Sequence, residues 1–274
     1  MSFSMERVVL TSTHLCNLKC RLCIQGVPFY KTPYHPSLDE LKEEIKSYFE
    51  LVDSVDIFEI SGGEPLLRND LDLVLEYIFL YNNRIKKEIR ITTNANIVPN
   101  DNLLSCAKKF GNKMFFLIDD YSVSKKAKEI AELLSVNNIG HRIRDYNDNL
   151  HFNGWVKFTD FTRIHTNEES KEIFKKCAFP SKLGFSFEIV GGEMHPCIIS
   201  KRLMERGIIP LNENEFINLL DKSESIESKI IKLENIYKLN PLTSCAYCSG
   251  LCEDSVRFSP AEQLTAEELR DMQQ

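Results

Sequence analysis

Runs of apolar residues that suit β-strands alternate along this chain with segments of helical spacing. Residues 7–11 and 55–60 have the β-branched and aromatic content of buried strands. Between them, Ser37 and Glu40 form a capping box, and apolar residues recur at helical spacing after it. The alternation continues with strands expected at 89–92, 114–118, 141–144 and 155–158 and helices at 69–81, 103–110 and 125–136. This order predicts an α/β fold with a parallel sheet or barrel.

Three cysteines follow the first expected strand at the spacing C-x3-C-x2-C. They are Cys16, Cys20 and Cys23. Three thiolates on a four-iron cluster leave one iron open for a substrate or cofactor. A structural zinc site needs four ligands and is the alternative, with His14 as the fourth. Disulfides are not expected, because the N-terminus lacks a secretory pattern and the chain should remain in the reducing cytoplasm.

The composition is typical of a globular enzyme. Hydrophobic residues make up 43% and charged residues 27% of the 274 positions. No apolar run approaches the roughly 20 residues of a membrane span. The net charge of -6 argues against a general nucleic-acid binder. We therefore expect neither a membrane nor a nucleic acid as a partner.

Glycines and polar residues stand directly after the expected strands. In parallel α/β folds, ligands bind outside the carboxyl ends of the strands, where the loops supply the chemistry. Glycine lacks a side chain, so the backbone can approach a ligand closely. The residues at these positions are Gly62, Gly63 and Glu64 after the second strand, Thr93 and Asn94 after the third, and Asp119 and Asp120 after the fourth.

The cysteine motif and the later segment Ser61-Gly62-Gly63-Glu64-Pro65-Leu66 together resemble the signature of the radical S-adenosylmethionine (SAM) superfamily. The resemblance implies an α/β fold of the partial (β/α)6 TIM-like barrel type. It also implies that Cys16, Cys20 and Cys23 ligate a [4Fe-4S] cluster whose open iron chelates SAM.

The resemblance also implies which residues bind SAM. Gly62, Gly63 and Glu64 would hold its amino group, and the Glu64 carboxylate would accept a charge-assisted hydrogen bond. Two further segments, 91–95 and 117–120, resemble stretches of the superfamily that touch SAM or substrate. They contribute Thr93, Asn94 and Asp119 to the expected cofactor site.

The last third of the chain carries a second set of cysteines. A hairpin is expected over 184–197, with helices at 212–220 and 264–272. The set consists of Cys177, Cys197, Cys245 and Cys248, and Cys106 is expected in the core. Three roles stay open for Cys252: a replacement ligand, a thiol beside the substrate, or a buried residue. The spacing resembles the auxiliary-cluster subdomains of SPASM and twitch radical SAM enzymes, including a butirosin-pathway cyclitol dehydrogenase. The resemblance implies a radical SAM core over 1–170, a subdomain over 171–274 and a second [4Fe-4S] cluster; zinc is the alternative for these thiols.

Two clusters imply an oxidoreductase. One cluster would cleave SAM to a 5'-deoxyadenosyl radical that removes a substrate hydrogen atom, and the other would accept an electron. With a proton also lost, an alcohol becomes a ketone. The expected substrate is therefore a small hydroxylated molecule such as a sugar, nucleotide sugar or cyclitol, and the expected partner is a one-electron reductant such as flavodoxin or ferredoxin. The catalytic candidates, at or beyond expected strand ends, are Tyr121, Arg142, Arg144 and Asp145.

Three alternatives stay open. One is a peptide-modifying maturase that forms a thioether, a carbon–carbon crosslink or an epimer. Fifteen residues before Cys16 and about one helix after Cys252 offer little room for peptide recognition, which favours a small molecule. The others are a radical sugar epimerase and a non-catalytic zinc-binding interaction protein.

Overall fold

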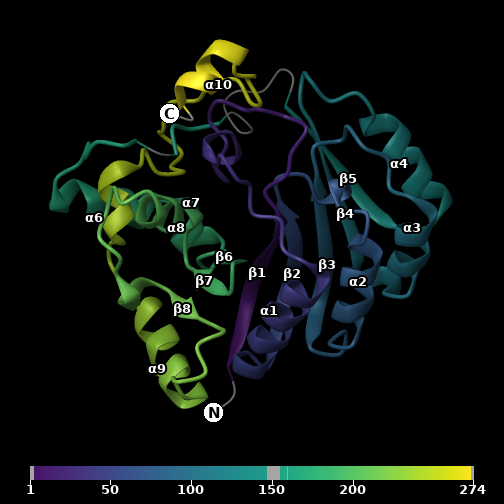
Figure 1. Cartoon of the computed structure of the whole chain (residues 1–274), viewed down its shortest axis with the longest axis horizontal. Coiled ribbons are helices and arrows are strands. Elements are labelled where there is room, and N and C mark those ends of the chain that lie inside the picture. Colours follow the sequence, from purple (N-terminus) through teal and green to yellow (C-terminus); the bar gives the residue numbers. More distant parts are fainter. Residues whose placement is uncertain (1–2, 147–154, 159, 273–274) are drawn as a thin grey trace.

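One eight-stranded sheet runs through the molecule. The computed structural model describes residues 3–146, 155–158 and 160–272. The strand order is β5-β4-β3-β2-β1-β6-β7-β8 (Figure 1). The strands are β1 Ser4–Thr13, β2 Ser54–Gly62, β3 Ile85–Thr93, β4 Met114–Asp120, β5 Gly140–Asp145, β6 Phe187–Val190, β7 Glu193–His195 and β8 Ile217–Asn218. Neighbours from β5 to β6 pair in parallel, whereas β7 and β8 pair antiparallel, so the expected α/β class is confirmed.

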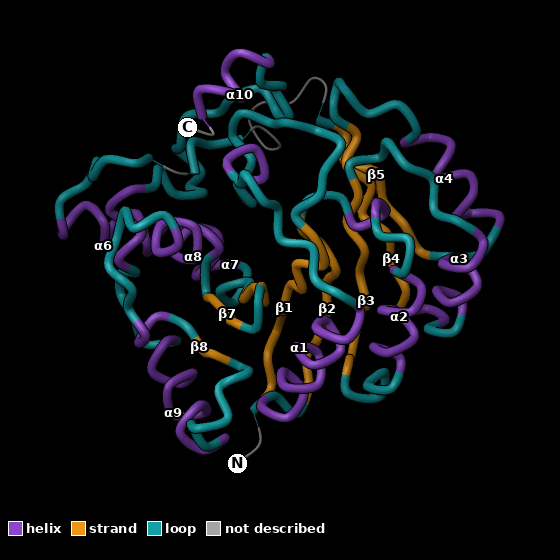
Figure 2. Tube along the Cα trace, viewed as in Figure 1, coloured by secondary structure: helices purple, strands orange, loops and turns teal. Residues whose placement is uncertain are grey.

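Helices α1 to α4 cover one face of the strands β1 to β5 (Figure 2). Their bounds are α1 Leu38–Leu51, α2 Leu71–Phe79, α3 Asp101–Lys108 and α4 Ala127–Val136. The predicted capping box begins α1, because Ser37 Oγ accepts from the Glu40 amide and the Glu40 carboxylate accepts from the Ser37 amide. Phe49 of α1 stacks on Phe58 of β2 with ring centroids 5.7 Å apart. The apolar face of each helix thus closes the core on this side of the sheet.

The carboxyl-terminal part extends the same sheet from β1. Its helices are α6 Asn167–Lys176, α7 Ala178–Lys182, α8 Ile198–Glu205, α9 Ile226–Ile236 and α10 Ala266–Met272. The expected hairpin is present as β6 and β7, and the sixth parallel strand is β6, which lies beside β1. Phe187 and Ile189 of β6 belong to one core cluster with Phe58. The segments before and after residue 170 therefore share one sheet and this core cluster, while a second core cluster that includes Ile199 and Leu203 lies in the later segment.

Two expected elements differ in the structure. Instead of a strand over 155–158, Trp155 forms an isolated antiparallel bridge with Phe258. Instead of a helix over 212–220, a 3-10 turn at Glu213–Glu215 is followed by β8. Ile217 is buried and pairs with Met194 of β7, so sheet pairing outweighed local helical spacing.

Across the described ranges, none of the helices combines the length and the apolar character needed to cross a lipid bilayer.

Candidate functional site

The cysteine loop after β1 rests against the two glycines after β2. The Gly63 amide donates to the Thr13 carbonyl over 2.6 Å, and the Glu64 amide donates to the Leu15 carbonyl over 2.8 Å. A Cβ atom on Gly62 would lie 2.2 Å from the Thr13 oxygen. Gly62 also has a φ of 130°, which side chains disfavour. These glycines are therefore required for the close approach of the cysteine loop.

A cavity of about 590 Å³ opens on the sheet face opposite α1 to α4. This volume lies in the range of small-molecule sites, roughly 300–1,000 Å³. Eleven of the site residues predicted before residue 170 line it: Cys16, Cys20, Cys23, Gly62, Gly63, Thr93, Asn94, Asp119, Tyr121, Arg142 and Arg144. The carboxyl ends of β1 to β5 bring them together, as the alternation of elements predicted.

Glu64 does not line this cavity. Its side chain is fully buried, and both carboxylate oxygens are engaged. Oε1 accepts from the Thr93 hydroxyl at 2.8 Å and from the Leu66 amide at 3.1 Å, and Oε2 accepts from the Asn94 amide at 2.7 Å. Burial raises its pKa to about 7, against the opposing effect of these hydrogen bonds. Glu64 ties the loop after β3 to the loop after β2.

Asp145 is also outside the cavity. Side chains alternate along a strand, so Arg142 and Arg144 of β5 face the cavity and Asp145 does not. Arg144 donates to both carboxylate oxygens of Asp119, at 2.5 and 2.8 Å, and the Tyr121 hydroxyl donates to Asp119 at 3.1 Å. Burial tends to lower the Arg144 pKa, but Asp119 outweighs burial and raises it. Neither arginine suits proton abstraction, because guanidinium groups stay charged in proteins.

Hydrogen-bond donors point at sulfur atoms of the first cysteine set. The Leu18 amide lies 3.4 Å from Cys16 Sγ, and the Gln263 side-chain amide lies 3.3 Å from Cys20 Sγ. Asn94 Nδ2 lies 3.6 Å from Cys16 Sγ. Donors to cysteine sulfur stabilise thiolate ligands and adjust the reduction potential of an iron–sulfur cluster.

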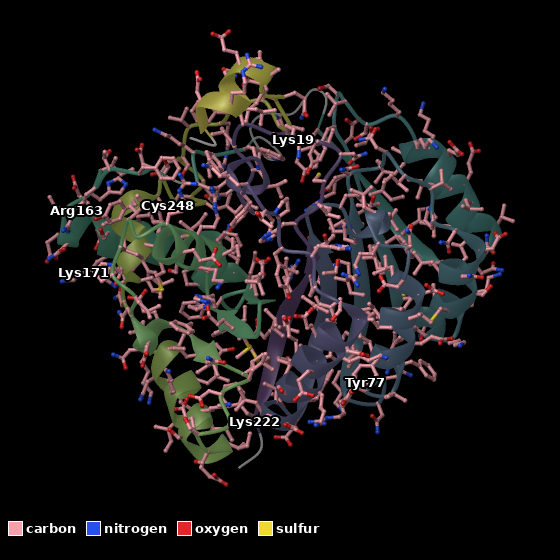
Figure 3. The ribbon with its side chains drawn as sticks, viewed as in Figure 1. Lys19, Tyr77, Arg163, Lys171, Lys222 and Cys248 are labelled. Atoms are coloured by element: carbon pink, nitrogen blue, oxygen red, sulfur yellow. The ribbon has the colours of Figure 1, made fainter. Side chains whose placement is uncertain are left out.

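The second set of cysteines surrounds a separate apolar cavity. Its wall contains all four predicted thiols: Cys177, Cys197, Cys245 and Cys248. The Leu251 amide donates to Cys177 Sγ at 3.4 Å and the Gly250 amide to Cys248 Sγ at 3.3 Å. Figure 3 labels Cys248 in this part of the molecule.

The two remaining cysteines stay outside both cavities. Cys252 is buried against the Ile173 carbonyl, and Cys106 is buried in the core on α3, as expected for that residue. Within the described ranges, no three His, Cys, Asp or Glu side chains converge closely enough to hold one metal ion. A cluster binds each thiolate at a different iron, so its ligands lie farther apart than those of a single zinc ion.

The two cavities share a wall. Phe158, Phe179, Cys197 and Leu251 line both of them. The hairpin of β6 and β7 ends at His195 and delivers Cys197 to this position. A group bound by Cys197 would therefore adjoin whatever occupies the larger cavity.

Two further carboxylates, Glu59 and Glu188, lie on the cavity face of the sheet and were not predicted from the sequence. Glu59 of β2 forms ion pairs with Arg7 and Arg90. Glu188 of β6 accepts from Gln25 Nε2 at 2.5 Å and from the Thr11 hydroxyl. Glu188 stands in the strand Phe187–Val190, where every residue is buried. The single charged residue in this otherwise apolar strand is the sequence feature that could have identified Glu188 as a site residue.

A known family profile covers the cysteine loop and the Gly-Gly pair. The profile of the Radical SAM superfamily matches residues 10–191, more than half of the chain. GTP 3',8-cyclase of Campylobacter jejuni is 30% identical over 125 residues, which are 45% of this chain and 37% of the relative. The corresponding protein of Sulfurovum sp. is 35% identical over 95 residues, 32% of this chain and 26% of the relative. The matches thus span about a third of these relatives.

Solved structures share the fold over nearly the whole chain. BtrN in complex with AdoMet and 2-DOIA has a TM-score of 0.56 at 16% identity, covering 94% of this chain and 99% of that one. The anSMEcpe complex with AdoMet and the Cp18Cys peptide has a TM-score of 0.52 at 12% identity, covering 98% and 95%. The superfamily profile covers the cysteine loop and the Gly-Gly pair, and both of these line the larger cavity. This chain is a member of the radical SAM superfamily.

Proposed function

We propose that this chain is an oxidoreductase that dehydrogenates a small hydroxylated substrate, such as a sugar, nucleotide sugar or cyclitol, with a second iron–sulfur cluster as electron acceptor. The observation that carries the proposal is the shared wall at Cys197. It joins the cavity of the radical SAM cysteines to the cavity of the four other thiols.

The residues of the larger cavity suit the cofactors of the superfamily. Cys16, Cys20 and Cys23 would hold a [4Fe-4S] cluster, and the adjoining Gly62, Gly63, Thr93, Asn94 and Asp119 would contact SAM. When bound, the cluster and SAM supply a radical that removes a hydrogen atom from the substrate. Glu64 does not contact the cavity but fixes the loops around it, because its carboxylate accepts hydrogen bonds from the Leu66 and Asn94 amides.

The four thiols of the second cavity suit a [4Fe-4S] cluster of the SPASM or twitch type. Four cysteines complete its ligands, so it would have no free iron for substrate and would serve in electron transfer. The two backbone amides near Cys177 and Cys248 are donors of the kind that stabilise such a cluster. A closed zinc site is the competing assignment for these residues.

The side chains of the larger cavity suit a polar molecule of limited size. Tyr121 packs against Trp155 at 5.5 Å and against Tyr146 at 4.9 Å, which forms an aromatic wall. Arg142 lines the cavity and forms no ion pair with any described residue. Charged and aromatic groups of this kind bind hydroxylated rings by hydrogen bonds and stacking.

The neighbours support more than one substrate class. The BtrN complex contains the small molecule 2-DOIA, whereas an anSMEcpe complex contains a peptide, and the curated relatives are GTP cyclases. A peptide-modifying maturase and a redox-neutral reaction on a nucleotide are therefore the competing functions. The reductant would be flavodoxin or ferredoxin, and we place the reaction in the cytoplasm.

The test compares the parent with Cys197→Ala and, as a matched control, Cys252→Ala. Each anaerobically reconstituted protein receives SAM, a reductant and a panel of cyclitols, sugars, nucleotide sugars, GTP and peptides. We expect the parent and Cys252→Ala to form a product lighter by two hydrogen atoms. Cys197→Ala should still cleave SAM but should not form that product.

Thermal melting and circular dichroism of both variants exclude misfolding, because a four-ligand site also stabilises its subdomain. A folded Cys197→Ala that forms oxidised product at the parent rate would refute the electron-acceptor role. An isomeric product from GTP, or a crosslinked peptide, would instead favour the competing functions.

A further inference from the structure

Among the described residues, three carboxylates line the larger cavity, and two of them are neutralised by arginine. Glu59 pairs with Arg7 and with Arg90, the latter at 3.5 Å, and accepts from the Thr92 hydroxyl at 2.7 Å. Asp119 has both oxygens engaged by Arg144. Neither carboxylate is free to accept a proton from a ligand.

Glu188 is the third carboxylate, and it forms no ion pair with any described residue. Its side chain has two donors, the Thr11 hydroxyl and Gln25 Nε2, and both donate to Oε1. Oε2 has no partner among the described residues and is not among the buried unpaired atoms. Since Glu188 is itself part of the cavity wall, Oε2 faces the cavity.

We propose that Glu188 Oε2 binds a hydroxyl group of the substrate and accepts its proton during oxidation. This inference rests on the proposed function. Conversion of a secondary alcohol to a ketone removes one hydrogen atom, one electron and one proton. The bound cofactors supply acceptors for the hydrogen atom and the electron, and the O–H proton moves to Glu188 as the C=O bond forms.

The surroundings of Glu188 suit a proton acceptor. Burial raises the pKa of Glu188 to about 7, and the negative charge of Glu59 also raises it. The hydrogen bonds from Thr11 and Gln25 and the positive charge of Arg7 lower this pKa. A base with a pKa near the working pH transfers protons most effectively. The Tyr30 hydroxyl donates to Glu205 at 3.1 Å; burial raises the pKa of Tyr30, and the charges of Glu205 and, more weakly, Glu188 raise it further.

Glu188 is also well placed relative to Cys197. Glu188 lies on β6 and is the pairing partner of Val9 on β1. Strand β7 pairs with β6, and Cys197 follows β7 in the chain. Both residues line the same cavity. The proposed acceptors of the proton and of the electron therefore approach the substrate from the same part of the fold.

The test uses the reconstituted full-chain holoenzyme, E188Q, and E44Q as a matched control. Glu44 is likewise buried with a pKa raised by burial to about 7, but it accepts from Tyr34 and the Gly192 amide and does not line the cavity. Glutamine has the shape of glutamate and keeps the contacts with Thr11 and Gln25, so E188Q should fold. Iron content and circular dichroism confirm that it does.

The probes are myo-inositol, glucose and UDP-glucose, and calorimetry measures their binding in the presence of SAM. We expect at least one probe to bind the parent and E44Q, more tightly as the pH rises through about 7. E188Q should bind it about tenfold more weakly and without this pH dependence, because a charge-assisted hydrogen bond is lost.

Equal affinity of E188Q and the parent, or no binding of any probe by the parent, would overturn the assignment. A third outcome separates the two proposals. Binding that depends on Glu188, in a parent that forms no oxidised product, would support the hydroxyl site and refute both the oxidation and the proton transfer.

Discussion

The side-chain amide of Gln263 donates from Nε2 to the sulfur of Cys20 over 3.3 Å, although 243 residues separate the two. The same side chain accepts from the Lys19 amide at 2.7 Å, and the Leu264 amide donates to the Lys19 carbonyl. The segment before α10 thus lies along the cysteine loop. A thiolate at Cys20 would have a fixed donor from the far end of the chain.

Replacing Gln263 with leucine should lower the reduction potential of the first cluster. A hydrogen bond of about 1 kcal/mol corresponds to about 40 mV for one electron, and its loss destabilises the reduced, more negative state. Electron paramagnetic resonance during a redox titration measures the potential. Glu262→Gln is the control, because it weakens the contact with Arg21 but keeps the donor to Cys20. An unaltered potential in Gln263→Leu would show that this contact does not affect the cluster.

Replacing Cys16, Cys20 and Cys23 together with alanine should abolish SAM cleavage and leave roughly four irons per chain on the other site. Iron and sulfide analysis and the yield of methionine measure the two effects. Cys106→Ala serves as the control, since Cys106 lies in the core on α3. Complete loss of iron, or retained cleavage, would contradict two independent clusters.

Glu64→Gln should lower the free energy of unfolding by about 1–3 kcal/mol and leave the iron content unchanged. An amide NH2 would replace one carboxylate oxygen, so a donor would face another donor at Leu66, Thr93 or Asn94. Urea denaturation measures the change, with the exposed Glu132→Gln as control. If the Glu64 variant is as stable as the parent, the buried contacts do not support the loops.

The stability of the parent should fall between about pH 5 and 8 in part because of Glu188. Burial raises its folded pKa from 4.5 to about 7, so its contribution is complete below pH 4.5 and is lost as the pH rises through 7. The loss is on the order of 3 kcal/mol for such a shift. Glu188→Gln should therefore lose less stability over this range than the parent.

Denaturation curves at several pH values test this expectation. The exposed Glu267→Gln should follow the parent, while Glu44→Gln, which removes another buried carboxyl with a pKa near 7, should flatten the profile as Glu188→Gln does. An identical pH profile for parent and Glu188→Gln would mean that Glu188 titrates equally in both states.

Local sequence determined much of the sheet and of the first cysteine site. Strand and helix periodicity depends on neighbouring residues, so β1 to β5 and α1 to α4 were predictable, as was the loop after each strand. The spacing of Cys16, Cys20 and Cys23 is a property of one short loop. Parallel strands then bring their carboxyl ends to one edge, which gathered most of the predicted residues at one cavity.

Contacts between distant segments decided the rest. The alternation of side chains along β5 places Asp145 outside the cavity. The Glu64 side chain is buried, and both of its carboxylate oxygens accept hydrogen bonds from the end of β3 and the loop after it. The pairing of β6 with β1 brought Glu188 beside Thr11 and Gln25, more than 160 residues away in the sequence. No local pattern encodes such a contact, because it depends on which strands become neighbours and which side chains lose water when they pack.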